Sequence, residues 1–199
     1  MSKQETDFPR PRRGREKVTY VGDHPKVSVR AYEQWRIGKD FDRDGTVFKG
    51  ASRLMASEHF ALREFFCKCG ECNFLRLNRN LPYALELLRE AVTADLRRLA
   101  DRPEDVPAAG APLIIDSAYR CAKHNRKVSN TKDSFHKHGY AADVRCNYCH
   151  SAKIFRLAVE LRHPLDPSYP VFGGVIKHEG MVHVDVRPPP QHVADGRAS

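Results

Sequence analysis

The feature of the sequence that most constrains the fold is a pair of strand-like segments, residues 171–178 and 181–187, joined by a tight turn at Glu179-Gly180. In the second segment valine occupies every other position, at Val182, Val184 and Val186. Successive side chains of a strand point to opposite faces of a sheet, so His183 and Asp185 share the face opposite the valines. The pattern predicts an antiparallel hairpin that buries one apolar face and presents polar groups on the other.

Four further segments fit an α+β domain around this hairpin. Residues 85–99 carry apolar side chains at three- and four-residue steps, which predicts an amphipathic helix. A second helix is expected from Ser151, a good N-cap residue, to a stop before Pro164. Apolar runs at 113–115 and 141–144 predict buried strands. We therefore expect the α+β class, with a mainly antiparallel sheet and flanking helices.

The two ends of the chain have the composition of tails. Basic residues interrupted by prolines crowd residues 1–17, which cannot bury a core and are expected to be disordered. Three consecutive prolines from Pro188 predict a second tail, 188–199, because proline ends a strand. Between the tails we expect an N-terminal extension, 18–56, and one folded domain, 57–187.

Composition narrows the class of protein further. No apolar run approaches the roughly 20 residues that cross a bilayer, so no membrane span is expected. The N-terminus lacks the apolar stretch of a cleavable secretory signal. Lys and Arg outnumber Asp and Glu by 34 to 25, which gives a formal net charge of +9. This excess favours association with polyanions, and both nucleic acid and an anionic cell wall qualify.

A second motif supplies candidate metal ligands. Residues 134–143, SFHKHGYAAD, carry His136 and Asp143 on either side of Gly139, where the backbone is free of Cβ constraints. Together with His183 they offer two imidazoles and a carboxylate. This set suits Zn²⁺, which takes three protein ligands in catalytic sites and keeps a fourth position for water. The chain has 10 histidines, so this spacing alone carries little weight.

The full pattern is more restrictive. The motif S-x-H-x-x-G-x-A-x-D at 134–143, followed by V-H-V-D at 182–185, resembles the zinc D-Ala-D-Ala carboxypeptidases and related phage endolysins, with the hedgehog zinc domain as a structural cousin. Residues 57–72 and the S-A-Y-R segment at 117–120 resemble the same family in the same order. The resemblance covers roughly residues 57–187. It implies a hedgehog/DD-peptidase-like fold and a zinc metallopeptidase that hydrolyses a peptide bond in peptidoglycan stem peptides or cross-links, as a carboxypeptidase or an endopeptidase.

The resemblance also implies individual roles. Arg120 would bind a carboxylate of the substrate and Ser134 would help to hold it. The zinc ligands would be His136, Asp143 and His183. An arginine suits its role because its planar guanidinium donates two parallel hydrogen bonds to a carboxylate. The alternative for Arg120 is an ordinary surface salt bridge.

The general base is less clearly marked. Several relatives have Glu or Asp three residues before the last histidine, and this chain has Gly180 there. Two carboxylates are candidates for the catalytic role: Asp185, on the same strand face as His183, is favoured, and Glu179, at the turn, is the second. For Asp185 the alternative is to orient a ligand histidine or to pair with Arg187.

Six cysteines form two clusters and one isolated position: Cys67, Cys69, Cys72, Cys121, Cys146 and Cys149. Four thiolates could close a structural zinc site. Disulfides formed after release from the cell and buried free thiols are the alternatives. The sequence does not identify which four would bind a metal.

Residues 40–45, DFDRDG, match the first half of an EF-hand calcium loop, with Asp40, Asp42 and Asp44 at ligand positions. Position twelve of such a loop is Ala51, where a bidentate glutamate is required. An acidic turn without Ca²⁺ is therefore preferred over a weak calcium site.

Two other functions remain open at this level. The basic tail and the cysteine clusters are also found in nucleic-acid-binding proteins, but that function gives no role to His136 or His183, so nucleic acid is not the expected partner. A hedgehog-like domain that binds zinc without hydrolysis is the other. We expect a monomer that is made in the cytoplasm and acts on peptidoglycan after release, as a phage or prophage product would.

Overall fold

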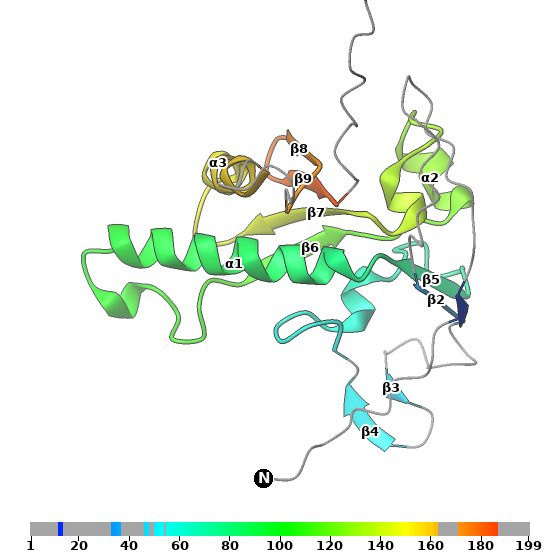
Figure 1. Ribbon diagram of the computed structural model, residues 1–199, viewed down its shortest axis with the longest axis horizontal. Coiled ribbons are helices and arrows are strands. Elements are labelled where there is room, and N and C mark those ends of the chain that lie inside the picture. Colours follow the sequence, from blue (N-terminus) through cyan, green and yellow to red (C-terminus); the bar gives the residue numbers. More distant parts are fainter. Residues whose placement is uncertain are drawn as a thin grey trace, which may run out of the picture.

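The computed structural model describes residues 55–162 and 171–186, together with four short strands nearer the N-terminus (Figure 1). These strands are β1 (Arg12–Arg13), β2 (Glu33–Arg36), β3 (Thr46–Val47) and β4 (Gly50–Arg53). The predicted calcium loop at 40–45 and the tail 188–199 lie outside the described residues. So does most of the segment 1–17, in which only β1 is described.

A four-stranded antiparallel sheet forms the centre of the domain. Its strands are β6 (Leu113–Ser117), β7 (Ala141–Cys146), β8 (Gly174–Lys177) and β9 (Val182–Asp185), in the order β6-β7-β9-β8. All three pairings are antiparallel, and β8 and β9 form the predicted hairpin. The predicted α+β class with a mainly antiparallel sheet is confirmed.

Two helices supply most of the remaining core. The helix α1 (Asn80–Leu99) buries its leucine and valine stripe, and α3 (Ser151–Arg162) packs on β7, β8 and β9 and against α1. Leu85, Leu88 and Val92 belong to the same apolar cluster as Val182 and Val184, and none of the five is exposed. Burying these side chains stabilises the fold by about 1.5–3 kcal/mol each. Both predicted helices are therefore confirmed.

A second, smaller layer carries the N-terminal part of the described chain. Strand β5 (Phe74–Leu77) pairs with β2, which pairs with β1, and β3 pairs with β4 separately. The 3-10 helix η1 (Leu62–Phe65) precedes β5 and buries Leu62 and Phe65 against the main core. The short helix η2 (Pro103–Asp105) lies in the connection from α1 to β6.

Several short elements were not predicted from the sequence, and two of them lie between β6 and β7 in the chain. These two are α2 (Ala122–Val128) and the 3-10 helix η3 (Phe135–His138). Neither contains enough apolar residues for a periodic pattern, since AKHNRKV buries only Asn125 and FHKH buries only His136. Their conformations depend on caps and tertiary contacts. Figure 1 shows α2 at the same end of the domain as β5.

Both faces of β9 are covered. Val182 and Val184 are 0% exposed, as the alternation predicts, but Asp185 on the opposite face is also 0% exposed. The polar face of the strand therefore points into protein and not into open solvent. Within the described residues, no helix combines the length and the apolar character needed to span a membrane.

Candidate metal centre

Three elements bring the predicted metal ligands together. Asp143 on β7 and His183 on β9 are directly paired across the antiparallel ladder, so their side chains share one face of the sheet. His136 comes from η3, which contacts the end of β7. The register of two strands and one short helix thus gathers three side chains separated by up to 47 residues.

The donor atoms of these residues lie close to one another. His183 Nδ1 is 2.9 Å and His136 Nε2 is 3.2 Å from the same carboxylate oxygen, Asp143 Oδ1. The two imidazole nitrogens are 3.1 Å apart. A tetrahedral zinc ion with bonds of about 2.0–2.1 Å separates its ligand atoms by about 3.3 Å. The three donors are therefore spaced as one face of such a tetrahedron, and the set fits zinc.

The ring orientation of each histidine is fixed by a contact of the ring nitrogen that faces away from the centre. His136 Nδ1 lies 2.6 Å from the Ala118 carbonyl oxygen, so Nδ1 carries the proton and donates it to that oxygen. The lone pair of Nε2 is then available to a metal ion. His183 Nε2 lies 3.4 Å from Asp185 Oδ2, so Nδ1 faces the centre. The role of Ala118 could not be predicted from the sequence, because a backbone carbonyl acts independently of the side chain attached to it.

The pKa values of Asp143 and His136 favour metal binding, whereas that of His183 opposes it. Burial raises the pKa of Asp143, but hydrogen bonds with His136 and His183 outweigh it, and the pKa lies below its ordinary value. Burial lowers the pKa of His136, which keeps its imidazole neutral. For His183 burial acts in the same direction, but hydrogen bonds with Asp143 and Asp185 raise its pKa overall. A carboxylate and a neutral imidazole are the forms that bind zinc.

Gly139 shapes the loop between the first two ligands. It ends η3 in the left-handed region at φ 73°. A Cβ at this position would collide with the backbone of Arg76 and Leu77 on the neighbouring β5 strand. Glycine alone adopts this left-handed conformation readily and leaves room for the β5 backbone. The structure therefore shows why a residue without a Cβ is needed at position 139.

Arg120 lies against the centre. Its Nη2 donates to Asp143 Oδ2, the oxygen that does not face the histidines, and its Nε donates to Ser117 Oγ at 2.8 Å. The side chain is 15% exposed. The guanidinium thus holds Asp143 in place and still reaches the solvent beside the donors.

Ser134 is the residue before η3 and is buried. Its carbonyl oxygen accepts from Lys137 N at 2.9 Å, and its side chain makes no capping hydrogen bond. The hydroxyl is therefore not engaged in holding the helix start, and it lies two residues from His136 in the chain.

The two candidate general bases lie in different environments. Asp185 is fully buried and contacts His183 on the side of the ring away from the donor atom. Glu179 is exposed in the turn between β8 and β9. Gly180 has φ 76°, a left-handed conformation that L side chains rarely adopt, which explains why no carboxylate stands at this position.

The structure separates the six cysteines into two groups. Cys67, Cys69, Cys72 and Cys121 lie together, whereas Cys146 and Cys149 lie apart from them at the end of β7, where their backbones pair and their thiols are free. A hydrogen bond from Cys72 lowers the pKa of the Cys67 thiol, and one from Cys149 lowers that of Cys146. Within the described residues, these four cysteines and the His136-Asp143-His183 centre are the groups that could hold a metal.

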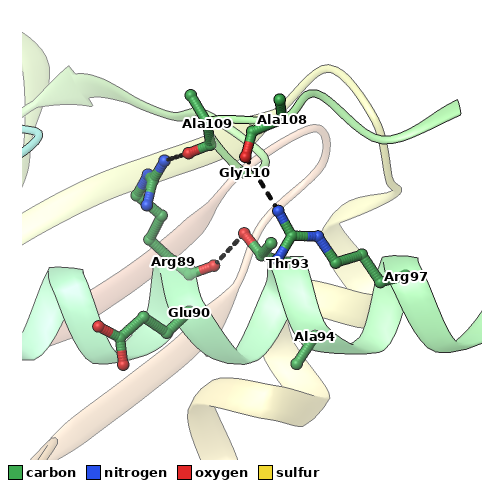
Figure 2. A pocket seen from close by; sticks show the side chains of 8 residues that line it. All are labelled: Arg89, Glu90, Thr93, Ala94, Arg97, Ala108, Ala109 and Gly110. Atoms are coloured by element: carbon green, nitrogen blue, oxygen red, sulfur yellow. Dashed lines mark hydrogen bonds between the residues drawn. The ribbon is translucent and has the colours of Figure 1, made fainter. Parts of the chain in front are cut away.

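A pocket between α1 and the loop that precedes β6 lies apart from this centre. Figure 2 shows Arg89 and Arg97 pointing across it, each donating to a backbone carbonyl of the loop, Ala109 and Ala108 respectively. Its cationic groups thus serve to close the loop on the helix. We assign the pocket no role in the site.

The fold and the donor set are those of an α+β protein with a candidate metal centre. The family model described as Peptidase M15 matches residues 58–185, which is more than half of the chain. The protein belongs to the Peptidase M15 family of zinc-dependent metallopeptidases. No curated protein and no solved structure matches the chain. The predicted relation to zinc D-Ala-D-Ala carboxypeptidases and endolysin-type peptidases is confirmed at the level of the family.

Proposed function

We propose that the protein hydrolyses a peptide bond in the stem peptides or cross-links of peptidoglycan, as a carboxypeptidase or an endopeptidase. The observation that carries the proposal is the convergence of His136 Nε2, Asp143 Oδ1 and His183 Nδ1 within 3.2 Å in a chain of the M15 family. A net charge of +9 suits an anionic wall as the partner. The protein would act there after release from the cell that made it.

In this proposal His136, Asp143 and His183 bind the zinc ion. When bound there, zinc would supply Lewis-acid chemistry, which polarises a carbonyl group and activates water at neutral pH. Ala118 and Asp185 fix the two imidazoles through their outer nitrogens. The burial of these groups reduces the effective dielectric and strengthens their electrostatic effect on the substrate.

Arg120 and Ser134 bind the substrate. The guanidinium of Arg120 is partly exposed beside the donors, and one of its hydrogen bonds can pass from Asp143 to an incoming carboxylate. The buried hydroxyl of Ser134 can donate to the same substrate group. Both stem peptides and cross-linked peptides carry free carboxylates near their peptide bonds. Arg120 and Ser134 would bind such a carboxylate.

Glu179 is the preferred proton acceptor. It lies on an exposed turn four residues before His183 in the chain, and its carboxylate is a residue type that serves as a general base. Asp185 is fully buried against His183, which favours an orienting role over proton transfer. This reverses the order of preference that the strand pattern alone suggests.

The test is digestion of purified peptidoglycan by the zinc-loaded protein, with the released fragments identified by mass spectrometry. We expect new termini that identify the bond, and none from a His136→Ala variant. A chain that binds zinc at this centre but releases no fragment would contradict the proposal. It would favour a binding domain without hydrolysis, the alternative suggested by Gly180.

A further inference from the structure

Four cysteine thiols from two distant segments meet beside α2. Cys67, Cys69 and Cys72 follow η1, and Cys121 is the N-cap residue of α2. Their sulfur atoms all lie within 4.8 Å of one another. Cys69 Sγ is 3.4 Å from Cys67 Sγ and 3.8 Å from Cys121 Sγ. Tetrahedral zinc with sulfur ligands at about 2.3 Å separates them by about 3.8 Å. The four sulfurs therefore already have the spacing of a zinc–tetrathiolate site.

We propose that Cys67, Cys69, Cys72 and Cys121 bind a structural zinc ion that is distinct from the ion of the peptidase centre. The proposal does not depend on peptidase activity. A closed set of four thiolates leaves no position for water, which is the arrangement of structural rather than catalytic zinc. On binding, four thiols lose their protons and Zn²⁺ takes four sulfur ligands, so the site carries a net charge of −2.

Backbone N–H groups point at these sulfurs. Cys69 Sγ accepts two such bonds, and Cys67 Sγ and Cys121 Sγ accept one each, all at 3.4 Å. The donors are the amides of Glu71, Cys72, Cys121 and His124. Such donors disperse the negative charge of metal-bound thiolates and orient them.

The turn between the cysteines has the conformation that this site requires. Gly70 has φ 68° and a Cβ there would meet nothing within 4 Å, so the glycine serves the backbone conformation and not a close contact. Gly70 N donates to the Cys67 carbonyl at 3.5 Å, which closes the turn that holds Cys69. His124 Nδ1 lies 3.3 Å from Cys67 Sγ, so an imidazole nitrogen also contacts the cluster.

A pair of disulfides is the chief alternative. A disulfide holds two sulfurs at about 2.05 Å and would divide the four into separate pairs. Here Cys69 Sγ lies at similar distances from two partners, which fits a shared central ion better. Cys146 and Cys149 are not members of the group, so they form a natural control pair in the same chain.

The proposed ion would fix the substrate-binding segment. Cys121 directly follows Arg120, whose backbone N–H donates to the His136 carbonyl at 3.0 Å. Tyr119 N donates to Phe65 O at 3.2 Å, two residues before Cys67. A zinc ion on Cys67 and Cys121 would therefore close a cross-link between η1 and the segment that carries Arg120.

The experiment measures zinc per chain in the purified full-length protein after loading and removal of free metal. We expect two ions in the wild type, one in the Cys69→Ser/Cys72→Ser variant and two in the Cys146→Ser/Cys149→Ser variant. The His136→Ala/His183→Ala variant should also retain one. If the His136→Ala/His183→Ala variant still held two ions, the proposed peptidase centre would be wrong and the cysteine site would not be affected. The proposal of the cysteine site and the proposed function can therefore fail separately.

A second measurement needs no cysteine variant and covers the case in which the double serine variant does not fold. Cobalt substituted into the wild type should give the intense thiolate-to-metal charge-transfer absorption of a tetrahedral sulfur site, and the His136→Ala/His183→Ala variant should retain it in full. Absence of that band, or a mass of the untreated chain lower by two hydrogens for each of two disulfides within the cluster, would overturn the proposal.

Discussion

At the scale of single residues, the site depends on side chains that each contact more than one partner. Arg120 contacts both Ser117 and Asp143, and Asp143 contacts Arg120 and both histidines. Because these interactions share members, removing one side chain changes the position of the others. The effects of substitution should therefore exceed those of isolated surface contacts.

Arg120→Lys should lower kcat/KM by about 10- to 100-fold. A lysine ammonium is a single point charge and cannot donate to Ser117, Asp143 and a substrate carboxylate in the fixed geometry of a guanidinium. Steady-state kinetics on a soluble peptidoglycan fragment measures the change. Arg145→Lys is the matched control, because Arg145 pairs with Asp116 at 3.0 Å and is 42% exposed. Equal losses in the two variants would contradict a special role for Arg120.

Glu179→Gln and Asp185→Asn should separate proton transfer from ligand orientation. We expect Glu179→Gln to lower kcat by about 100-fold or more with zinc content unchanged, because the proton acceptor is lost. Asp185→Asn should instead weaken zinc binding by about 10- to 100-fold, because His183 loses its ionised partner. Paired measurements of kcat and zinc affinity decide between them. Full activity in Glu179→Gln would exclude it as the general base.

At the scale of elements, one buried carboxylate links the two main helices. Asp95 on α1 contacts Lys153 and Arg156 on α3, at 2.9 and 3.1 Å, and Arg98 on its own helix at 2.8 Å. Hydrogen bonds from Arg98 and then Lys153 lower the pKa of Asp95 to about 2. The carboxylate thus stabilises the packing of α3 on α1 while it is ionised.

Asp95→Asn should lower the free energy of unfolding by about 1 kcal/mol at neutral pH, a modest value because Arg98 and Arg156 are at least half exposed. The folded pKa lies below the unfolded value of about 3.9, so this contribution is fully present above pH 4 or so and is lost as the pH falls towards about 2.

Urea unfolding of the wild type and the variant between about pH 7 and about pH 3 measures the difference. Glu160→Gln is the control, since Glu160 pairs with Arg156 on an exposed face and should contribute less than about 0.5 kcal/mol. A difference between wild type and Asp95→Asn that stayed constant over this range would contradict the assignment.

At the scale of the whole molecule, the candidate metal centre connects the sheet to the N-terminal layer. Its ligands come from β7, β9 and η3, and η3 also contacts β5. A bound ion should therefore stabilise the whole domain, by about 2.7 kcal/mol when free zinc is 100 times its dissociation constant.

This stabilisation should grow as the pH rises. The raised pKa of His183 means that, without metal, its protonated form contributes stability below about pH 6.5, which is lost as the pH rises through the folded pKa. Zinc needs the neutral ring, so its binding strengthens over the same interval. The zinc-induced increase in Tm, measured from about pH 5 to about pH 8, should be larger at the higher pH. The His136→Ala/His183→Ala variant corrects for other sites, and a difference that fell with pH would contradict this linkage.

Much of this architecture could be predicted from the sequence, because the patterns involved are local. The spacing of the apolar residues in α1 is that of a helix, and the spacing of the valines in β9 is that of a strand. Neither spacing depends on what the element packs against. The motifs at 134–143 and 182–185 contain the three candidate metal ligands that the structure brings together. Helix ends and strand limits moved by a few residues, since terminal hydrogen bonds depend on neighbours.

Only the tertiary structure decided the features that depend on contacts between distant segments. It selected four of six cysteines by bringing Cys121 to the loop of residues 67–72, and it gave Ala118 O its contact with His136. It also buried Asp185 against His183, although strand alternation had suggested an accessible carboxylate. The physical reason is that alternation fixes the face on which a side chain lies, whereas the packing of other elements determines what covers that face.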